Sequence, residues 1–89
     1  MTHRATAGFW KRFDAQPDRV QALARKAFRQ LQADPRYPSL HFKVLAAHEP
    51  PLWSVRIGRS YRARAVEEED GTLYWFWIGS HADYDRVIG

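Results

Sequence analysis

Residues 52–66 read LWSVRIGRSYRARAV, and this stretch decides the fold. Gly58-Arg59-Ser60 separates two runs of alternating residues, a pattern typical of two antiparallel strands joined by a tight turn. If all three residues form the turn, Ile57 faces Tyr61 and the apolar side chains collect on one face. The other face then carries a row of arginines: Arg56, Arg62 and Arg64. A two-residue turn would mix the two faces, so we predict the three-residue turn, with helices on the apolar face.

The rest of the second half predicts further strands. Residues 40–45 form a candidate strand, and Pro50-Pro51 breaks the chain after it. Asp70-Gly71 is a strong hairpin signal. The last predicted strand, residues 73–78, is apolar on both faces, as expected for a central strand, and Gly79 ends it.

The first half predicts two helices. Thr6 is a suitable cap for a short helix, and Pro17 opens a second helix in its first turn, where a missing N–H costs little. Asp34-Pro35 ends that helix. Its apolar residues recur at helical spacing: Val20, Leu23, Ala24, Ala27, Phe28 and Leu31. Residues 1–5 show no clear pattern, so we expect a stub of a strand or none there. The predicted class is α+β, a helical hairpin on a twisted antiparallel sheet of about four strands with a short C-terminal turn or helix.

Composition places the chain in a broad class. Its 89 residues predict a single domain, residues 1–89, with a core just large enough to fold. The absence of cysteine excludes disulfides and thiolate chemistry. No apolar run resembles a signal peptide or a membrane span, so we expect a cytoplasmic protein. Fourteen basic against ten acidic residues give a net charge of +4, which favours a polyanionic partner.

The arginine row has several interpretations. Like charges on neighbouring strands repel, which costs stability unless something offsets them. A bound phosphate backbone would do so, and so would the acidic run at residues 67–70 or simple hydration. No acidic residue stands between the arginines, which is in favour of phosphate.

The segment at residues 75–84, WFWIGSHADY, is the second candidate. His81 follows the last predicted strand, where side chains can reach a cleft, and histidine exchanges protons near neutral pH. Asp83 and Tyr84 are close enough in sequence to orient it or to share proton transfer. Alternatively, His81 is a surface residue near a helix cap and Tyr84 packs under the sheet, and spacing alone favours this alternative. The other histidines, His3, His41 and His48, have no metal-ligand spacing, so we expect no metal and no cofactor.

The motifs occur in an informative order along the chain: Phe9-Trp10, Tyr37-Pro38-Ser39-Leu40-His41-Phe42-Lys43, Trp53-Ser54-Val55-Arg56-Ile57-Gly58, Tyr61-Arg62-Ala63 and Trp77-Ile78-Gly79-Ser80-His81-Ala82-Asp83-Tyr84. In this order they resemble the RelE/ParE superfamily of bacterial toxin–antitoxin toxins, over nearly the whole chain from Thr6. The resemblance implies two N-terminal helices against a twisted antiparallel sheet. Many members are endoribonucleases that cut mRNA, typically on the ribosome, and a cognate antitoxin blocks the site. Another branch inhibits DNA gyrase.

The C-terminal Gly-Ser-His-x-Asp pattern resembles the ribonuclease branch more closely. By that resemblance His81 takes the place of a catalytic acid or base, and Arg62 that of the arginine on the adjacent strand. RNA cleavage needs no metal if proton transfer groups and cations surround the phosphate. The expected site has catalytic residues His81, Arg62 and Arg56, and RNA-binding residues Lys43, Arg64, Tyr84 and Arg59. The alternatives are a non-enzymatic gyrase inhibitor and an inactive family member.

Overall fold

The computed structural model describes residues 2–45 and 48–83. Along the chain the elements are β1 (Thr2–Ala5), α1 (Ala7–Asp14), α2 (Asp18–Ala33), the short 3-10 helix η1 (Pro38–Leu40), β2 (Lys43–Leu45), β3 (Leu52–Ile57), β4 (Tyr61–Glu67) and β5 (Thr72–Ser80). Within those residues, no helix is long and apolar enough to cross a membrane.

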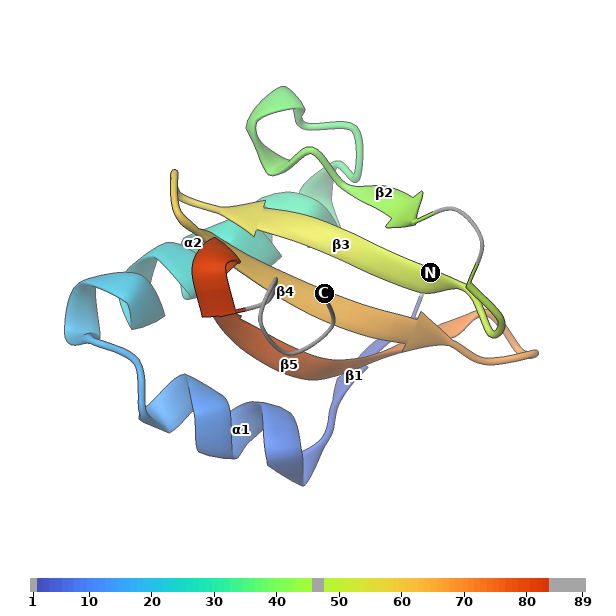
Figure 1. The fold of residues 1–89 in the computed structure, drawn as a ribbon. Helices are drawn as coiled ribbons and strands as arrows, with labels where there is room; N and C mark the ends of the chain where they lie inside the picture. The colour runs from blue at the N-terminus through green and yellow to red at the C-terminus, as the bar shows by residue number, and fades with distance from the viewer. Residues whose placement is uncertain (1, 46–47, 84–89) are drawn as a thin grey trace.

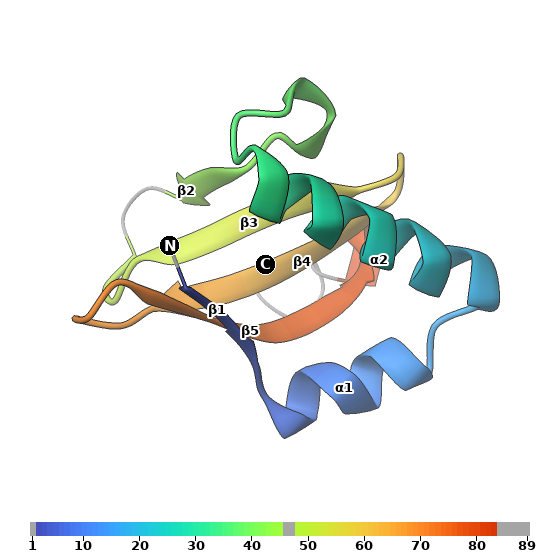
Figure 2. The same ribbon diagram turned by 180° about the vertical axis from the view of Figure 1, so that it is seen from behind.

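The strands form one sheet in the order β1-β5-β4-β3-β2. Figure 1 shows α2 behind this sheet, and Figure 2 shows it in front, so α2 covers one face. Helix α1 lies along the β5 side of the sheet in both views. The expected α+β class and the helical hairpin are confirmed.

The sheet differs from the expectation by one strand. Residues Thr2–Ala5 form β1, which pairs in parallel with β5. The sheet therefore has five strands and is mixed rather than purely antiparallel. Strand β1 is mostly exposed and has no apolar pattern, so pairing with β5 stabilises it rather than burial of its own side chains. After β1 the backbone continues the pairing, because the Thr6 N–H donates to the Trp75 carbonyl at 3.0 Å.

Strand β2 is shorter than the segment at 40–45 that we expected. Pro38–Leu40 form η1 instead, and His41 follows with a left-handed backbone at φ 44°. Such a residue cannot continue a regular strand, so the extended backbone begins only at Lys43. Leu40 is nonetheless buried in the core.

The helix ends follow the sequence signals closely. The Thr6 hydroxyl accepts a hydrogen bond from the Phe9 N–H at 3.1 Å and so caps α1. Pro17 precedes α2 as its capping residue, one position before the first turn in which we expected it. Asp34 follows the last residue of α2 in extended conformation, which ends the helix as predicted.

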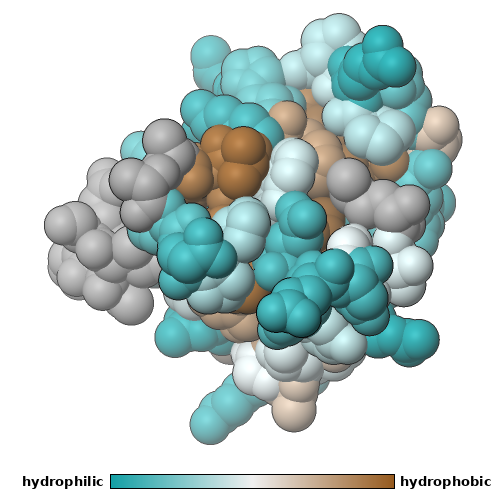
Figure 3. All heavy atoms as spheres, turned by 90° about the vertical axis from the view of Figure 1, so that its right-hand side faces the viewer, coloured by the Kyte–Doolittle hydropathy of each residue, from teal (hydrophilic) through white to brown (hydrophobic). Residues whose placement is uncertain are grey.

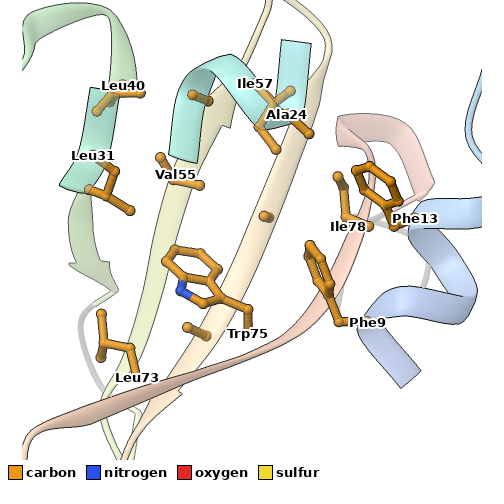
Figure 4. Packing of buried hydrophobic residues seen from close by; sticks show 13 residues of the cluster. Phe9, Phe13, Ala24, Leu31, Leu40, Val55, Ile57, Leu73, Trp75 and Ile78 are labelled. Carbon is orange, nitrogen blue, oxygen red and sulfur yellow. The ribbon is translucent and has the colours of Figure 1, made fainter. Parts of the chain in front are cut away.

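The core lies between the sheet and the two helices (Figure 4). Trp75 stands near its centre and meets Phe28 of α2 edge to face, with ring centroids 5.1 Å apart. On one side of Trp75, Figure 4 shows Phe9 and Phe13 of α1 next to Ile78 of β5, and all three are buried. Burying each large apolar side chain contributes about 1.5–3 kcal/mol. The core thus anchors β4 and β5, the strands that carry the candidate site.

Candidate functional site

The predicted turn register is confirmed. Ile57 pairs with Tyr61 and Arg56 pairs with Arg62, so Gly58, Arg59 and Ser60 form the turn. Gly58 has φ 61°, a left-handed conformation that glycine adopts without strain. Because Val55 and Ile57 belong to the core beneath α2 and side chains alternate along a strand, the arginines lie on the opposite face.

Two rows of paired residues cross that face, which we call the arginine face. One row runs Lys43, Ser54, Arg64 and Trp77, from β2 to β5. The other runs Arg56, Arg62 and Gly79, from β3 to β5. The arginine face therefore spans the sheet from β2 to β5, next to the turn at residues 58–60.

A bulge brings Trp77 onto this face. Trp77 pairs with Arg64 and Trp75 pairs with Ala65, so Phe76 is an extra residue on β5. The bulge reverses the alternation of the strand, and Trp75 enters the core while Trp77 joins the arginine face. There the Trp77 ring lies over Gly79, since a Cβ on Gly79 would stand 2.8 Å from Cζ2 of the indole.

The two paired arginines are held by the backbone of the turn region. The Arg62 Nη1 donates to the Tyr61 carbonyl at 2.8 Å, and the Arg56 Nε donates to the Gly58 carbonyl at 3.0 Å. Burial lowers the pKa of the Arg62 guanidinium, and the charges of Arg56 and Arg64 lower it further. The arginines thus repel one another in the free protein, and an anion bound between them would relieve that repulsion.

Arg64 is the most buried arginine of the arginine face. Its side chain is only 4% exposed, and its Nη1 donates to the Ala63 carbonyl at 3.3 Å. Little of the Arg64 side chain is therefore exposed to solvent. Its charge still contributes to the arginine face, because it lowers the pKa of Arg62.

His81 lies beside the turn. Strand β5 continues through Ser80, past the glycine at which we expected it to end. The exposed His81 donates its backbone N–H to the Ser60 carbonyl at 2.7 Å. A helical turn begins at His81, and the Ser80 hydroxyl caps it by accepting the Asp83 N–H at 3.0 Å. His81 therefore stands at the same end of the sheet as the arginine pair, while Tyr84 lies outside the described residues.

The remaining candidate cations are exposed. Arg59 lies in the turn itself, next to Ser60, whose carbonyl holds His81. Lys43 lies on β2, opposite Ser54. The structure thus brings Arg56, Arg59, Arg62 and His81 to one end of the sheet, and it leaves Lys43 one row away on the outer strand. Among the residues described, there is no group of three or more His, Cys, Asp or Glu that would hold a metal ion.

The acidic run does not offset the arginines. Residues 67–70 lie at the opposite end of β4 from Tyr61, around the β4–β5 hairpin. There the Glu67 Oε1 accepts a hydrogen bond from the Trp53 indole at 2.7 Å, and Asp70 accepts from the Thr72 N–H. Figure 3 views the side of the molecule to the right in Figure 1, which includes this hairpin; hydrophilic residues surround smaller hydrophobic patches on this side. The acidic run is therefore separated from the Arg56–Arg62 pair by the length of β4.

One feature of the site was missed in the sequence. A pocket of about 360 Å³ adjoins the turn, and its lining includes Lys26, Tyr37, Arg56 and Arg59. Nothing in the sequence related Lys26 of α2 to Arg56, thirty residues later.

A comparison with curated protein sequences finds no match. Among solved structures, the RelB–RelE antitoxin–toxin complex of Methanococcus jannaschii contains a chain similar to this one, with a TM-score of 0.70 and 15% identity, covering 94% of this chain and 98% of that chain. A chain of the RelBE2 toxin–antitoxin complex of Mycobacterium tuberculosis gives a TM-score of 0.66 and 22% identity, covering 90% and 96%.

The archaeal RelE–RelB complex of Pyrococcus horikoshii gives a TM-score of 0.67 and 13% identity, covering 89% of this chain and 92% of that chain. At these identities the likeness concerns the fold. The sequence itself is matched from residue 18 to residue 86 by the family described as the ParE-like toxin domain. This chain belongs to the ParE-like toxin domain family.

Proposed function

We propose that this toxin is a metal-independent mRNA endoribonuclease that inhibits translation in the cytoplasm. One observation carries the proposal: the paired arginines Arg56 and Arg62 lie at the same end of the sheet as the exposed His81. A phosphate held by two guanidinium groups next to an imidazole has the charges and the proton donor or acceptor that phosphodiester cleavage requires.

The chemistry assigns a role to each group. The 2′-hydroxyl of the RNA attacks the adjacent phosphorus, and the bond to the 5′-oxygen of the next nucleotide breaks. The 2′-hydroxyl loses a proton and the departing 5′-oxygen gains one, and His81 performs one of these two transfers. Arg56 and Arg62 stabilise the charge that grows on the phosphate oxygens. The products are a 2′,3′-cyclic phosphate and a 5′-hydroxyl end.

Lys43 and Arg59 extend the cationic surface along the RNA, because both are exposed next to this site. Tyr84 remains a proposed RNA contact by the resemblance. Arg64 supports the site through its charge rather than through contact. The proposed partners are mRNA, on the ribosome or free, and a cognate antitoxin. The antitoxin is supported by the three similar folds above, each of which was solved in a toxin–antitoxin complex.

Expression of the toxin in cells, followed by mapping of mRNA 5′ ends, tests the proposal. We expect discrete new 5′ ends with the wild-type protein. His81→Ala removes one proton transfer and should lower cleavage about 10²–10⁴-fold, with the same circular dichroism spectrum as the wild type. His48→Ala, which changes an exposed histidine outside the proposed site, is the matched control and should cleave normally.

Two results would contradict the proposal. An unchanged cleavage rate in His81→Ala would remove this residue from the chemistry. DNA breaks or loss of supercoiling, with mRNA intact, would instead identify a gyrase inhibitor.

A further inference from the structure

The pocket next to the turn lies at an open edge of the sheet. Strand β2 pairs only with residues 52–54 of β3, so Arg56 stands where no strand of the described residues covers the outer edge of β3. Arg56 belongs to the arginine face by its pairing with Arg62, and it also lines the pocket. This one side chain therefore connects the proposed cleavage site with the pocket.

Helix α2 forms the opposite wall. Gly58 of the turn approaches α2 closely, since a Cβ on Gly58 would stand 3.1 Å from the Leu23 methyl carbon Cδ1. Leu23 and Leu40 give the pocket apolar walls, and Lys26 lines it from α2. The volume of about 360 Å³ falls within the usual range for sites that bind small molecules, about 300–1,000 Å³.

The charges in the pocket all have one sign. Three cationic side chains line it, Lys26, Arg56 and Arg59, and its other polar groups are neutral: Gln30, Tyr37 and Ser39. None of the described residues that line the pocket is an aspartate or a glutamate. Converging cations with no carboxylate among them suit an anion. Tyr37, which is 42% exposed, adds an aromatic surface on which a base can stack.

We propose that this pocket binds one nucleotide of single-stranded RNA that flanks the cleaved linkage. Lys26 and Arg59 hold its phosphate, Tyr37 stacks on its base, and Leu23 contacts the ribose or the base. Arg56 lies between the flanking nucleotide and the scissile phosphate, so the RNA passes around the open edge of β3. The inference rests on the proposed function, because it identifies the pocket as part of the same RNA path.

Binding of RNA that cannot be cleaved tests this directly. The probe is a series of fully 2′-O-methylated, fluorescently labelled oligonucleotides of stepwise increasing length, which lack the attacking hydroxyl. Fluorescence anisotropy gives a Kd for each length and salt concentration. We expect one step in length at which the affinity of the wild-type protein increases sharply, as the flanking nucleotide enters the pocket.

Two variants should remove that step for different reasons. Tyr37→Ala loses stacking, worth roughly 5–150-fold in Kd for one base. Lys26→Gln loses one phosphate contact and should reduce the slope of log Kd against log salt by about 0.7. Lys11→Gln, which removes the same charge from an exposed position on α1, is the matched control and should bind like the wild type.

The outcomes separate this inference from the proposed function. If the protein cleaves mRNA but Lys26→Gln and Tyr37→Ala bind every length like the wild type, the pocket is not an RNA subsite and the nuclease stands. If the variants lose the step while the wild type produces no mRNA ends in cells, the pocket binds RNA and the proposed reaction is wrong. Equal losses in Lys11→Gln would show a general charge effect and overturn the inference. A loss in Lys26→Gln alone would show an anion site without base recognition, which also overturns it.

Discussion

Gly79 illustrates how a single residue shapes the arginine face. It lies opposite Arg62 in the sheet, and the Trp77 ring covers its Cα so closely that no side chain fits between them. Trp77 is only 3% exposed, so its ring is enclosed by neighbouring atoms and has little room to move away. A side chain at this position would displace the indole next to the guanidinium groups.

Gly79→Ala should therefore destabilise the protein by about 1–3 kcal/mol, the usual cost of overpacking. Urea unfolding followed by tryptophan fluorescence measures the change. Gly8→Ala provides the control, because a Cβ there has only an ordinary contact of 3.7 Å with the Thr6 hydroxyl and alanine favours helices. We expect the control to be neutral or stabilising, and equal effects in the two variants would refute the contact-based explanation.

Strand β1 is held in place by its contacts with β5. The His3 ring stacks on Trp75, with centroids 6.0 Å apart, and its Nδ1 accepts a hydrogen bond from the Trp75 indole N–H at 3.1 Å. Both side chains line a hollow of about 380 Å³ between the two helices, with Arg4, Arg25 and Arg29 also in its lining. A ring nitrogen accepts a hydrogen bond only when it carries no proton, so the contact with Trp75 needs Nδ1 of His3 unprotonated.

Burial lowers the pKa of His3 from its usual 6.5, and the positive charge of the chain's N-terminus lowers it further. Below pH 6.5 the unfolded chain binds a proton at His3 that the folded protein binds only at lower pH. Folding stability should therefore fall as the pH decreases from 6.5 toward the lowered pKa. Urea unfolding at a series of pH values tests this, and His3→Phe, which keeps an aromatic ring, should flatten the decline. An identical pH dependence in His3→Phe would show that another group is responsible.

Across the whole molecule, basic and acidic side chains gather at opposite ends of β4. The arginines and the turn lie at one end of this strand, and the acidic hairpin lies at the other. A net charge of +4 concentrated in this way raises the local potential and attracts polyanions. The same concentration destabilises the free protein, since burial and the charges of Arg56 and Arg64 lower the pKa of Arg62 and so disfavour its charged state.

Added salt should partly relieve this repulsion. Between low salt and about 0.15 M NaCl, where the Debye length shortens to about 8 Å, we expect the Tm of the wild-type protein to rise. Arg62→Gln should show a smaller rise, because the central charge is gone. Lys11→Gln removes one charge from an exposed position on α1, outside the sheet, and should retain the wild-type salt dependence. Differential scanning calorimetry measures all three, and equal salt dependence in the two variants would contradict the local repulsion.

Local signals in the sequence determined the helices, the three-residue turn and the pairing of Arg56 with Arg62. Each of these depends on neighbours in the chain: a capping hydroxyl at Thr6, a glycine with a left-handed backbone at position 58, and alternation along two adjoining strands. The family also followed from motifs along the chain. Short-range spacing is sufficient for such features because turn length sets strand register.

The tertiary structure alone decided the rest. The bulge at Phe76 exchanges the faces of Trp75 and Trp77, and alternation in the sequence does not reveal where it is interrupted. Strand β1 exists because β5 has an unpaired edge beside it. Arg64 lies beneath the surface, although it continues the same row of arginines in the sequence. The pocket needs Lys26 and Arg56 to meet across the open edge of β3, and only long-range packing brings residues that distant together.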